Sequence, residues 1–510
     1  MKKFISIILF MALLFSGGQY PSAAEVKTYP NSVNVSVHIN NSLTLTLNGS
    51  YQLTNRQTGS KSIIPPGTTI TSSSNGTAVT VSYTGFSQSS TSGFDVQELA
   101  GTATLAVFTS QTDMRRGADA SYSKIYTFQT GDSANYLGSF TNKTTGELWY
   151  NVTLGSYTGW VPAKNAKLTE GDKLSLAKVS NGLTYRGSFY LKKNGSQVEV
   201  INMLDMEDYL KGVVPNEMPA SWHKESLKAQ AIAARSYAAN MMLLTSTAAS
   251  QVYRGYTSED TRANTAIKET EGLLVKYNGK PIQTFFFSTS GGKTANVGDV
   301  WNSNQSSFPY LVSVEDKYEV SPYSNWSEEY SAAAILKSFG FDSTAKLLDI
   351  SLEVKGANGE VGAVTVKTTK GDKTVSGNES VIRRLFPVSS SAHYNLLYSN
   401  WFTMEITRSQ PALSVQTNSG IFPIEDMKGQ TVQTPSGQMT LTESQVSVQT
   451  PSGVITSESG TGEVLSVTLN GKGWGHRIGM SQYGAKAYAE NGWTASQIIT
   501  HYFKGTTVSK

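Results

Sequence analysis

One acidic residue of this chain occupies a position where its carboxyl group could donate or accept a proton in a reaction. Glu217 lies in a short segment between Pro215 and Pro219. Because proline fixes its own backbone and restricts the residue before it, Asn216 to Met218 should form a rigid connection. A carboxyl group held in this way is a candidate general acid or base. The alternative is an ordinary solvated loop acid, since acidic side chains are mostly exposed.

A helix is expected directly after this segment, from about Ser221. Its apolar face is marked by residues that recur at helical spacing, namely Leu227, Ala231, Ala234, Ala238 and Met241. The helix also carries Gln230, Arg235 and Tyr237. Gln230 and Tyr237 lie on or beside the apolar face. A buried amide there could bond the core backbone or support the Glu217 segment.

Two further segments combine glycines with polar side chains. The run Ser288-Thr289-Ser290-Gly291-Gly292 follows a strand pair that turns at Asn278-Gly279. Its glycines would let the backbone approach a ligand closely, but the spacing of a phosphate-binding loop is absent. Near the C-terminus, glycines surround His476, and Ser481-Gln482 then opens a helix. The imidazole is either a structural hydrogen-bonding group or part of a site.

The composition excludes several classes of chemistry. The chain has 510 residues, no cysteine and a formal net charge of +4. It therefore has no thiolate nucleophile, thiolate metal site or disulfide, and its stability must come from core burial. The mild basic excess suits an anionic surface such as a cell wall and falls short of a nucleic-acid-binding signature.

The N-terminus has the pattern of a secretory signal peptide. Two lysines precede an apolar run from Phe4 to Phe15, and small residues follow at Ser22-Ala23-Ala24. The run is too short for a stable membrane span. We therefore expect residues 1–24 to be removed and the mature protein to be secreted, extracellular or attached to the cell wall. The alternative is an uncleaved anchor, which would be its only link to a membrane.

We expect a mixed α+β protein with a β-rich core domain and a few helices. Residues with period-two alternation predict strands in the N-terminal part. The aromatic hairpin Trp149–Val152 and Gly159–Val161 has the spacing of bacterial SH3-like domains, although it could also be an extension without a ligand. The motif VQT followed by N-S-G or P-S-G occurs three times and predicts β-hairpins. The expected parts are an N-terminal β part of the core (residues 25–106), an SH3-like barrel (107–168), the main core (169–408), the repeat insertion (409–462) and a C-terminal core segment (463–510).

Three blocks of sequence together resemble the stage II sporulation protein D and LytB (amidase enhancer) family. They are EDYLKGVVPNEMPASWHKESLKAQAIAARSY, FFFSTSGGKTANVGDVW with PYLVSV after it, and GWGHRIGMSQYGAKAYAENGWTASQIITHYF. The resemblance is strong from Leu183 to Thr506 and weaker from Val33 to Ala106.

The resemblance implies an activity on peptidoglycan. Sporulation protein D members are lytic transglycosylases whose catalytic glutamate lies in the E-M-P segment, which corresponds to Glu217 here. One carboxyl group protonates the glycosidic oxygen between N-acetylmuramic acid and N-acetylglucosamine. It then takes the proton of the C6 hydroxyl as an anhydro ring closes. Most glycosidases use two carboxylates, and the sequence offers no second acid in an equally constrained motif. Acid function at neutral pH needs a raised pKa, which apolar neighbours such as Val213 and Trp222 could supply.

The resemblance also implies supporting roles. Arg235 could orient Glu217 or stabilise charge on the substrate, Ser288, Ser290 and Gly291 could bind the glycan, and His476, Ser481 and Gln482 could line the opposite side of a cleft. With Gln230 and Tyr237 these form the expected substrate-binding set. LytB-type members are enhancers of an amidase, so the alternative function is a non-catalytic wall-binding enhancer. The expected partners are peptidoglycan glycan strands and, for an enhancer, a cell-wall amidase.

The chain departs from the family pattern at two places. Some members hold zinc through a histidine and a cysteine in an H-S-T-C-G-G segment. Phe287 and Ser290 occupy the matching positions here, so we expect no such zinc, and no cofactor is implied. Arg477 replaces the glycine that usually follows His476. We expect its side chain to narrow the cleft or to contact an anionic muropeptide.

Overall fold

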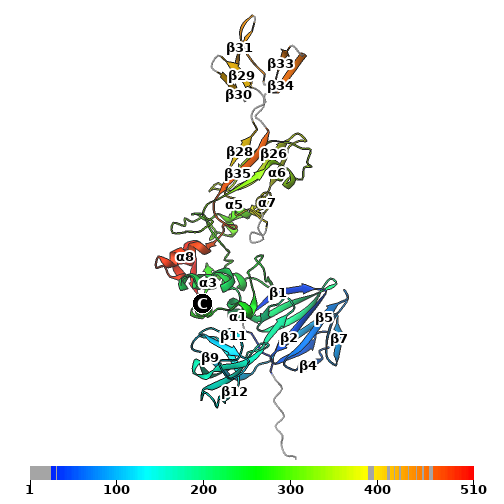
Figure 1. The fold of residues 1–510 in the computed structure, drawn as a ribbon, viewed down its shortest axis with the longest axis vertical. Helices are drawn as coiled ribbons and strands as arrows, with labels where there is room; N and C mark the ends of the chain where they lie inside the picture. The colour runs from blue at the N-terminus through cyan, green and yellow to red at the C-terminus, as the bar shows by residue number, and fades with distance from the viewer. Residues whose placement is uncertain are drawn as a thin grey trace, which may run out of the picture. The chain divides into compact units, whose positions relative to one another are not determined.

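The computed structural model describes residues 25–29, 31–388, 395–409, 414–417, 420–423, 427–434, 436–443, 445–450, 453–458 and 463–510. The predicted signal peptide lies outside this part of the chain. Within it, no helix is both long and apolar enough to cross a membrane. Strands predominate over helices and the two are mixed, so the predicted α+β fold is confirmed (Figure 1).

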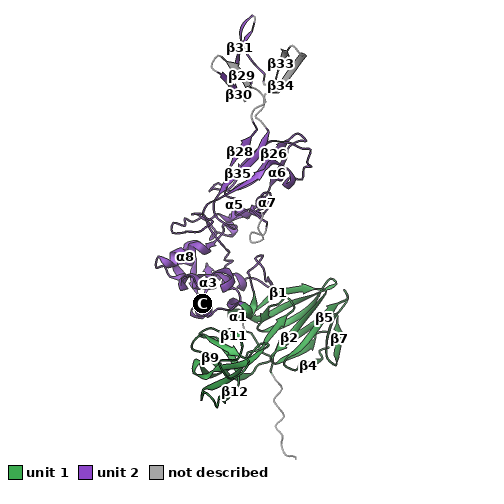
Figure 2. Ribbon diagram, viewed as in Figure 1, with its two compact units in different colours: residues 1–208, 254–257 green, residues 209–253, 258–510 purple. Residues whose placement is uncertain are grey.

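The chain forms two compact units (Figure 2). One comprises the chain up to Asp208 together with Arg254–Thr257, and the other comprises Tyr209–Tyr253 and Ser258–Lys510. Two of the three boundaries between the units lie in the helix α1 (Met206–Lys211) and in the short η2 (Gly255–Ser258).

The first unit contains two antiparallel sheets, and period-two alternation correctly predicted their strands at residues 33–39, 42–47 and 78–83. Alternate side chains, such as Val33, Val35, Leu43 and Leu45, are buried. The strand β19 of one sheet contacts β2 and β5 of the other. Within this unit the first sheet has the order β1 (Ser32–Asn40), β19 (Gln197–Asp205), β18 (Ser188–Asn194), β8 (Phe94–Glu98), β3 (Tyr51–Asn55), β4 (Lys61–Ile64). The second has the order β17 (Thr184–Tyr185), β16 (Leu176–Val179), β2 (Ser42–Asn48), β5 (Thr68–Ser74), β6 (Val79–Tyr83), β7 (Phe86–Ser90).

A third sheet of this unit coincides with the predicted SH3-like part. The expected aromatic hairpin forms, with Trp149 opposite Pro162 and Val152 opposite Gly159. Ala106, Phe108 and Val161 belong to its own hydrophobic core. The strand order is β11 (Lys124–Phe128), β10 (Thr112–Arg115), β14 (Tyr157–Pro162), β13 (Leu148–Leu154), β12 (Ser133–Thr141), β9 (Thr102–Phe108), β15 (Ala166–Asp172), with η1 (Ala163–Asn165) before β15.

The predicted helix after Ser221 is present in the second unit and packs against several other helices. The helix α3 (Lys224–Ala239) begins after His223, whose side chain accepts a hydrogen bond from Glu225 N. Its alanine-rich surface lets other helices approach closely, and it contacts α4 (Thr261–Glu269), α8 (Gln482–Glu490) and α9 (Ala495–Tyr502). Short elements nearby are α2 (Val214–Glu217), β20 (Leu244–Thr245), β21 (Leu274–Tyr277), β22 (Lys280–Pro281), α5 (Val297–Trp301), η3 (Gln305–Ser307) and β37 (Thr507–Ser509).

Two sequence blocks that are distant along the chain meet as a pair of short parallel strands. The strand β23 (Phe286–Phe287) pairs with β36 (Met480–Ser481). Near these strands, Thr289 and Trp474 exchange two backbone hydrogen bonds: Thr289 N donates to Trp474 O at 3.0 Å, and Trp474 N donates to Thr289 O at 2.8 Å. The Ser288–Gly292 run and the glycine-rich turn at His476 are therefore neighbours in the fold.

Two small sheets and two helices of the second unit share another hydrophobic core, which includes Val366, Phe386 and Leu469. One sheet has the order β24 (Trp326–Ser331), β35 (Val464–Gly471), β28 (Phe402–Arg408), and the other has the order β25 (Leu347–Val354), β26 (Val361–Thr368), β27 (Lys373–Ser376). The helices are α6 (Ala332–Ser338) and α7 (Glu379–Arg384).

Each copy of the VQT repeat ends the first strand of a two-stranded hairpin, as predicted. The three hairpins are β29 (Ser414–Thr417) with β30 (Gly420–Pro423), β31 (Thr431–Thr434) with β32 (Gly437–Thr440), and β33 (Gln445–Thr450) with β34 (Gly453–Glu458).

Candidate functional site

A cleft of about 670 Å³ in the second unit contains Glu217. Its size falls within the range of roughly 300–1,000 Å³ that is typical of ligand-binding pockets. The walls combine polar side chains with many aromatic rings, whose faces carry partial negative charge and favour contact with the C–H groups of a sugar. The aromatic lining residues are Trp222, Tyr237, Phe285, Phe286, Phe287, Trp301, Trp474 and Tyr483.

The backbone at Glu217 is fixed by local hydrogen bonds. The predicted rigid connection is a single helical turn, α2, and Glu217 is its last residue. Glu217 N donates to Val213 O at 3.1 Å. Asn216 Nδ2 donates to Gly212 O and to Ser258 Oγ, both at 2.7 Å. The carboxyl group therefore projects from a turn that is fixed at both sides.

Two donors hold the carboxyl group of Glu217. Val252 N donates to Oε1 at 2.7 Å, and Gln482 Nε2 donates to Oε2 at 3.3 Å. The segment that carries Val252 is itself anchored by buried Gln251, which accepts a hydrogen bond from Tyr209 Oη at 2.7 Å and donates to Ala234 O at 3.2 Å. The donors thus come from a loop fixed by the core and from the first residue of α8.

The surroundings of Glu217 favour its neutral form. Burial raises its pKa from 4.5 to about 7, and the hydrogen bonds from Val252 and Gln482 oppose this rise because they stabilise the carboxylate. A carboxyl group with a pKa near 7 is protonated in a large fraction of molecules at neutral pH. It can then give up its proton and take one back, which is what a group acting first as acid and then as base requires.

His476 belongs to the aromatic wall of the cleft. Its ring centre lies 5.0 Å from that of Trp301 and 5.5 Å from that of Phe287. Nδ1 accepts a hydrogen bond from Ile478 N at 3.1 Å, and burial lowers the pKa of the ring to about 4. The imidazole is therefore neutral at physiological pH and shapes the wall.

The structure brings together part of the predicted site and places the rest behind it. The predicted residues that line the cleft are Glu217, Tyr237, Ser288, His476 and Gln482. Those that do not are Gln230, Arg235, Ser290, Gly291 and Ser481.

Arg235 and Gln230 lie inside the helical core. Arg235 donates to Leu273 O at 3.2 Å and to Ile267 O at 3.4 Å, which ties α3 to the end of α4. Gln230 is fully buried in α3, and within the described part of the chain its amide makes no hydrogen bond. Neither side chain lines the cleft, because both are buried in the interior around α3.

Ser290, Gly291 and Ser481 converge on one acid that the sequence did not single out. Ser290 N donates to Glu319 Oε2 at 2.7 Å and Gly291 N donates to Oε1 at 2.8 Å. Ser481 Oγ also donates to Oε2. Glu319 therefore fixes the backbone that presents Ser288 on one side and Gln482 on the other. These three residues support the site from behind.

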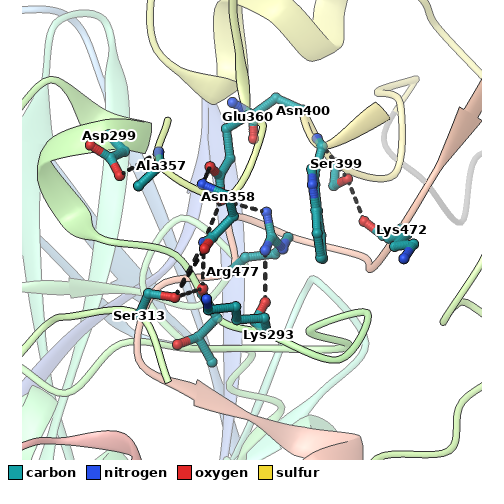
Figure 3. A network of polar contacts seen from close by, with 12 residues as sticks. Lys293, Asp299, Ser313, Ala357, Asn358, Glu360, Ser399, Asn400, Lys472 and Arg477 are labelled. Atoms are coloured by element: carbon teal, nitrogen blue, oxygen red, sulfur yellow. Dashed lines mark hydrogen bonds and ion pairs between the residues drawn. The ribbon is translucent and has the colours of Figure 1, made fainter. Parts of the chain in front are cut away.

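The expectation that Arg477 narrows the cleft or contacts a muropeptide is wrong. Its side chain is completely buried and directed away from the cleft lining. Figure 3 shows the guanidinium between Glu360 and Lys293: it donates to Glu360 Oε1 at 2.9 Å and to Lys293 O at 2.7 Å. It also donates to Ser290 O at 3.0 Å. These partners hold the backbone of Arg477 at a φ of 62°. This left-handed conformation is uncommon for residues other than glycine and asparagine.

The cleft also contains an ion pair that the sequence did not predict. Glu379 and Arg383 both line it, with Arg383 Nη1 2.8 Å from Glu379 Oε2. Arg383 Nε also donates to Leu397 O at 2.7 Å. The only signal was a Glu and an Arg four residues apart in a helix, a spacing that usually marks a solvated helix face.

The residues at the matching positions do not fit the zinc site that some members of the family carry. Phe287 contributes a ring to the cleft wall, and Ser290 Oγ accepts a hydrogen bond from Gly292 N at 3.0 Å. A phenyl ring cannot ligate a metal. Elsewhere in the described residues, no group of three or more His, Asp or Glu side chains is placed to hold a metal ion.

Comparison with known proteins supports the family resemblance, and the matching family model covers the first of the three sequence blocks. The family model described as stage II sporulation protein matches residues 194–277, which include Glu217, and the model of the bacterial SH3 domain matches residues 110–167. The predicted family resemblance and SH3-like domain are confirmed.

Two curated relatives extend the similarity beyond these ranges. The chain is 34% identical over 325 residues to the amidase enhancer of Bacillus subtilis (strain 168), a match that covers 59% of this chain and 40% of that protein. It is 27% identical over 333 residues to the stage II sporulation protein D of the same strain, covering 61% of this chain and 76% of that protein. The match thus spans less than half the length of the amidase enhancer.

Proposed function

We propose that this chain, which contains a stage II sporulation protein domain and a bacterial SH3 domain, is a secreted lytic transglycosylase that cleaves peptidoglycan glycan strands in cell-wall remodelling or sporulation. The observation that carries the proposal is the environment of Glu217. Its carboxyl group lies in an aromatic cleft, is held by two hydrogen bonds, and has a pKa raised to about 7 by burial.

In this proposal Glu217 transfers a proton twice. The neutral carboxyl group protonates the oxygen of the bond between N-acetylmuramic acid and N-acetylglucosamine as that bond breaks. The resulting carboxylate takes the proton of the C6 hydroxyl, whose oxygen attacks C1 and closes the anhydro ring. Atoms and charge balance without water, and Glu217 ends in its starting state. Val252 N and Gln482 Nε2 stabilise the carboxylate between the two transfers.

The other carboxylate of the cleft is better suited to binding than to catalysis. Hydrolysis by the usual glycosidase mechanism needs a second carboxylate as nucleophile or as base. Glu379 is engaged by Arg383 at 2.8 Å, and Arg383 is fixed in turn by Leu397 O. We assign this pair to substrate contact.

A second candidate function is a non-catalytic, wall-binding enhancer of an N-acetylmuramoyl-L-alanine amidase. It is favoured by the similarity to a protein named amidase enhancer and by the SH3 domain. In that case the cleft would bind glycan without cleaving it, and the amidase would be a partner.

One experiment separates the two functions. Purified protein is incubated with isolated glycan strands, and separately with cell walls and an added cell-wall amidase. A transglycosylase releases fragments with anhydro-muramyl ends, which are lighter by one water than hydrolysis products. An enhancer releases none, sediments with the walls and raises the rate of the amidase.

A further inference from the structure

We propose that a second pocket of the same unit binds a saccharide, so that the protein holds a glycan strand at a place next to the Glu217 cleft. The pocket has a volume of about 750 Å³ and is lined by Trp326, Trp401, Lys472 and neighbouring residues. The identity of the saccharide as peptidoglycan glycan rests on the proposed function. The existence of the site rests on its own geometry.

Two indole rings line the pocket together with Val354 and Phe402, and glycines make room for the indoles. Trp326 Nε1 donates to Gly473 O at 2.9 Å. A Cβ atom at Gly471 would lie 2.0 Å from Cζ2 of Trp326, so any other residue there would displace the ring. A Cβ atom at Gly359 would lie 3.3 Å from Nε1 of Trp401. Both rings are partly exposed, as a stacking surface for sugar requires.

The position of Trp401 is fixed from the inside of the fold. The fully buried guanidinium of Arg477 lies 4.0 Å from the centre of its ring. Figure 3 shows Asn358 beside Glu360, the ion-pair partner of Arg477, and Asn358 Nδ2 donates to Glu360 Oε1 at 3.0 Å. The same amide donates to Thr294 O at 3.0 Å. An indole ring held in this way loses little freedom when a ligand stacks on it.

The rim of the pocket is polar and carries one positive charge. Asn325, Ser327 and Thr403 are exposed and line it. The ammonium group of Lys472 lies 5.3 Å from the centre of the Trp401 ring, and among the described residues it has no ion-pair partner. Amide and hydroxyl groups match the hydroxyl and acetamido groups of an aminosugar, and a lysine can pair with the carboxylate of a muramyl group. One cation is too few for a nucleic acid.

The pocket and the cleft are joined by a very short piece of chain. Lys472 lines the pocket, and Trp474 lines the cleft. Two residues span at most about 7 Å. A glycan strand is a linear polymer, so one strand could occupy both places, with the second site holding the part of the strand that is not being cleaved.

The test uses the full chain with Glu217→Gln, so that binding is measured without cleavage. The probes are chitohexaose and peptide-free glycan strands, and binding is followed by isothermal titration calorimetry. Thr403→Trp fills the pocket and Lys472→Glu reverses its charge, and neither touches the hydrogen bonds of Arg477. Lys367→Glu, an exposed lysine on β26 outside the pocket, is the matched control.

We expect Thr403→Trp to weaken the binding of both probes by about tenfold. We expect Lys472→Glu to weaken the binding of glycan strands more than the binding of the uncharged chitohexaose. We expect Lys367→Glu to leave the affinity for both probes unchanged. Unchanged affinity in both pocket variants, with near-ultraviolet circular dichroism showing an intact fold, would overturn the site. This outcome is independent of the proposed function, which fails only if wild type does not cleave glycan.

Discussion

Gln482 donates its side-chain amide to Glu217 across 265 residues of sequence, with Nε2 3.3 Å from Oε2. Gln482 is the first residue of α8, and α8 packs on α3, the helix that follows Glu217. The two sequence blocks at either end of the second unit are thereby joined at one carboxyl group. This contact gives Gln482 a specific role, because the hydrogen bond stabilises the ionised form of Glu217.

The rate of glycan cleavage should fall as pH rises through about 7. Glu217 must be protonated to act as an acid, and burial raises its pKa to about 7. The measurement is kcat/KM for glycan strands between pH 5 and 9. A rate that rises across this range would show that the ionised carboxyl group starts the reaction.

Gln482→Leu should move this alkaline limb to higher pH. The amide of Gln482 lowers the pKa of Glu217 by favouring its carboxylate, so its removal makes the carboxyl group a weaker acid. The same pH profile measured on the variant checks this. A limb that moves to lower pH, or stays in place while the rate falls, would assign Gln482 to substrate binding alone.

Glu217→Gln should be more stable than wild type at high pH. The folded-state pKa of Glu217, about 7, exceeds its ordinary value of 4.5. Wild type therefore loses stability as pH rises from about 4.5 to about 7, and glutamine does not ionise. Because the group also borders an open cleft, we expect a gain of about 1–3 kcal/mol above pH 7.

Urea denaturation of both proteins at pH 5 and pH 8 measures this difference. The advantage of the variant should be larger at pH 8. An equal difference at the two pH values would show that Glu217 is not buried enough to have a raised pKa.

Glu379→Gln should slow cleavage without changing its product. The loss of the carboxylate frees Arg383, which lines the same cleft, and we expect about a tenfold fall in kcat/KM. Mass spectrometry should still find anhydro-muramyl ends. Complete loss of activity comparable to that of Glu217→Gln would indicate a two-carboxylate mechanism instead. Glu353→Gln, an exposed acid outside the cleft, is the control.

Arg477→Gly should destabilise the second unit even though glycine accepts the backbone conformation better. The variant leaves the fully buried Glu360 without its ion-pair partner, since Arg477 Nη1 lies 2.9 Å from Glu360 Oε1 in wild type. The hydrogen bonds from Asn358 remain but carry no positive charge. Such a loss costs about 3–5 kcal/mol. The double variant with Glu360→Gln should lose less than the sum of the two single variants. Strict additivity in urea denaturation would show that the two side chains are not coupled.

The sequence predicted the elements better than the identity of the lining residues. Period-two alternation located several strands of the first unit, and helical spacing located α3, because both patterns reflect burial on one face. The rigid connection at Glu217 followed from two prolines. These are local properties, and the chain near each residue determines them.

What the sequence could not provide is the direction of polar side chains near the site. Arg235 and Arg477 carry charges that suggested substrate contact, yet both donate to backbone carbonyl groups in the interior. Glu319 was missed because two of its donors are the backbone groups Ser290 N and Gly291 N, which only folding brings to it. The pair of Arg383 with Glu379 has an ordinary helical spacing, and only folding places it in the cleft. A buried charge is satisfied by long-range geometry, which no local pattern encodes.

The most direct test of the central claim compares the products that wild type, Glu217→Gln and Glu490→Gln form from peptide-free glycan strands. Glu490 is an exposed acid of α8 paired with Lys486 and serves as the control. We predict anhydro-muramyl ends with wild type and with Glu490→Gln. We predict a rate lower by about 100- to 10,000-fold with Glu217→Gln, which should remain folded and still bind the strands. Release of the same ends by Glu217→Gln at the wild-type rate would contradict the assignment of Glu217 as the acid and base.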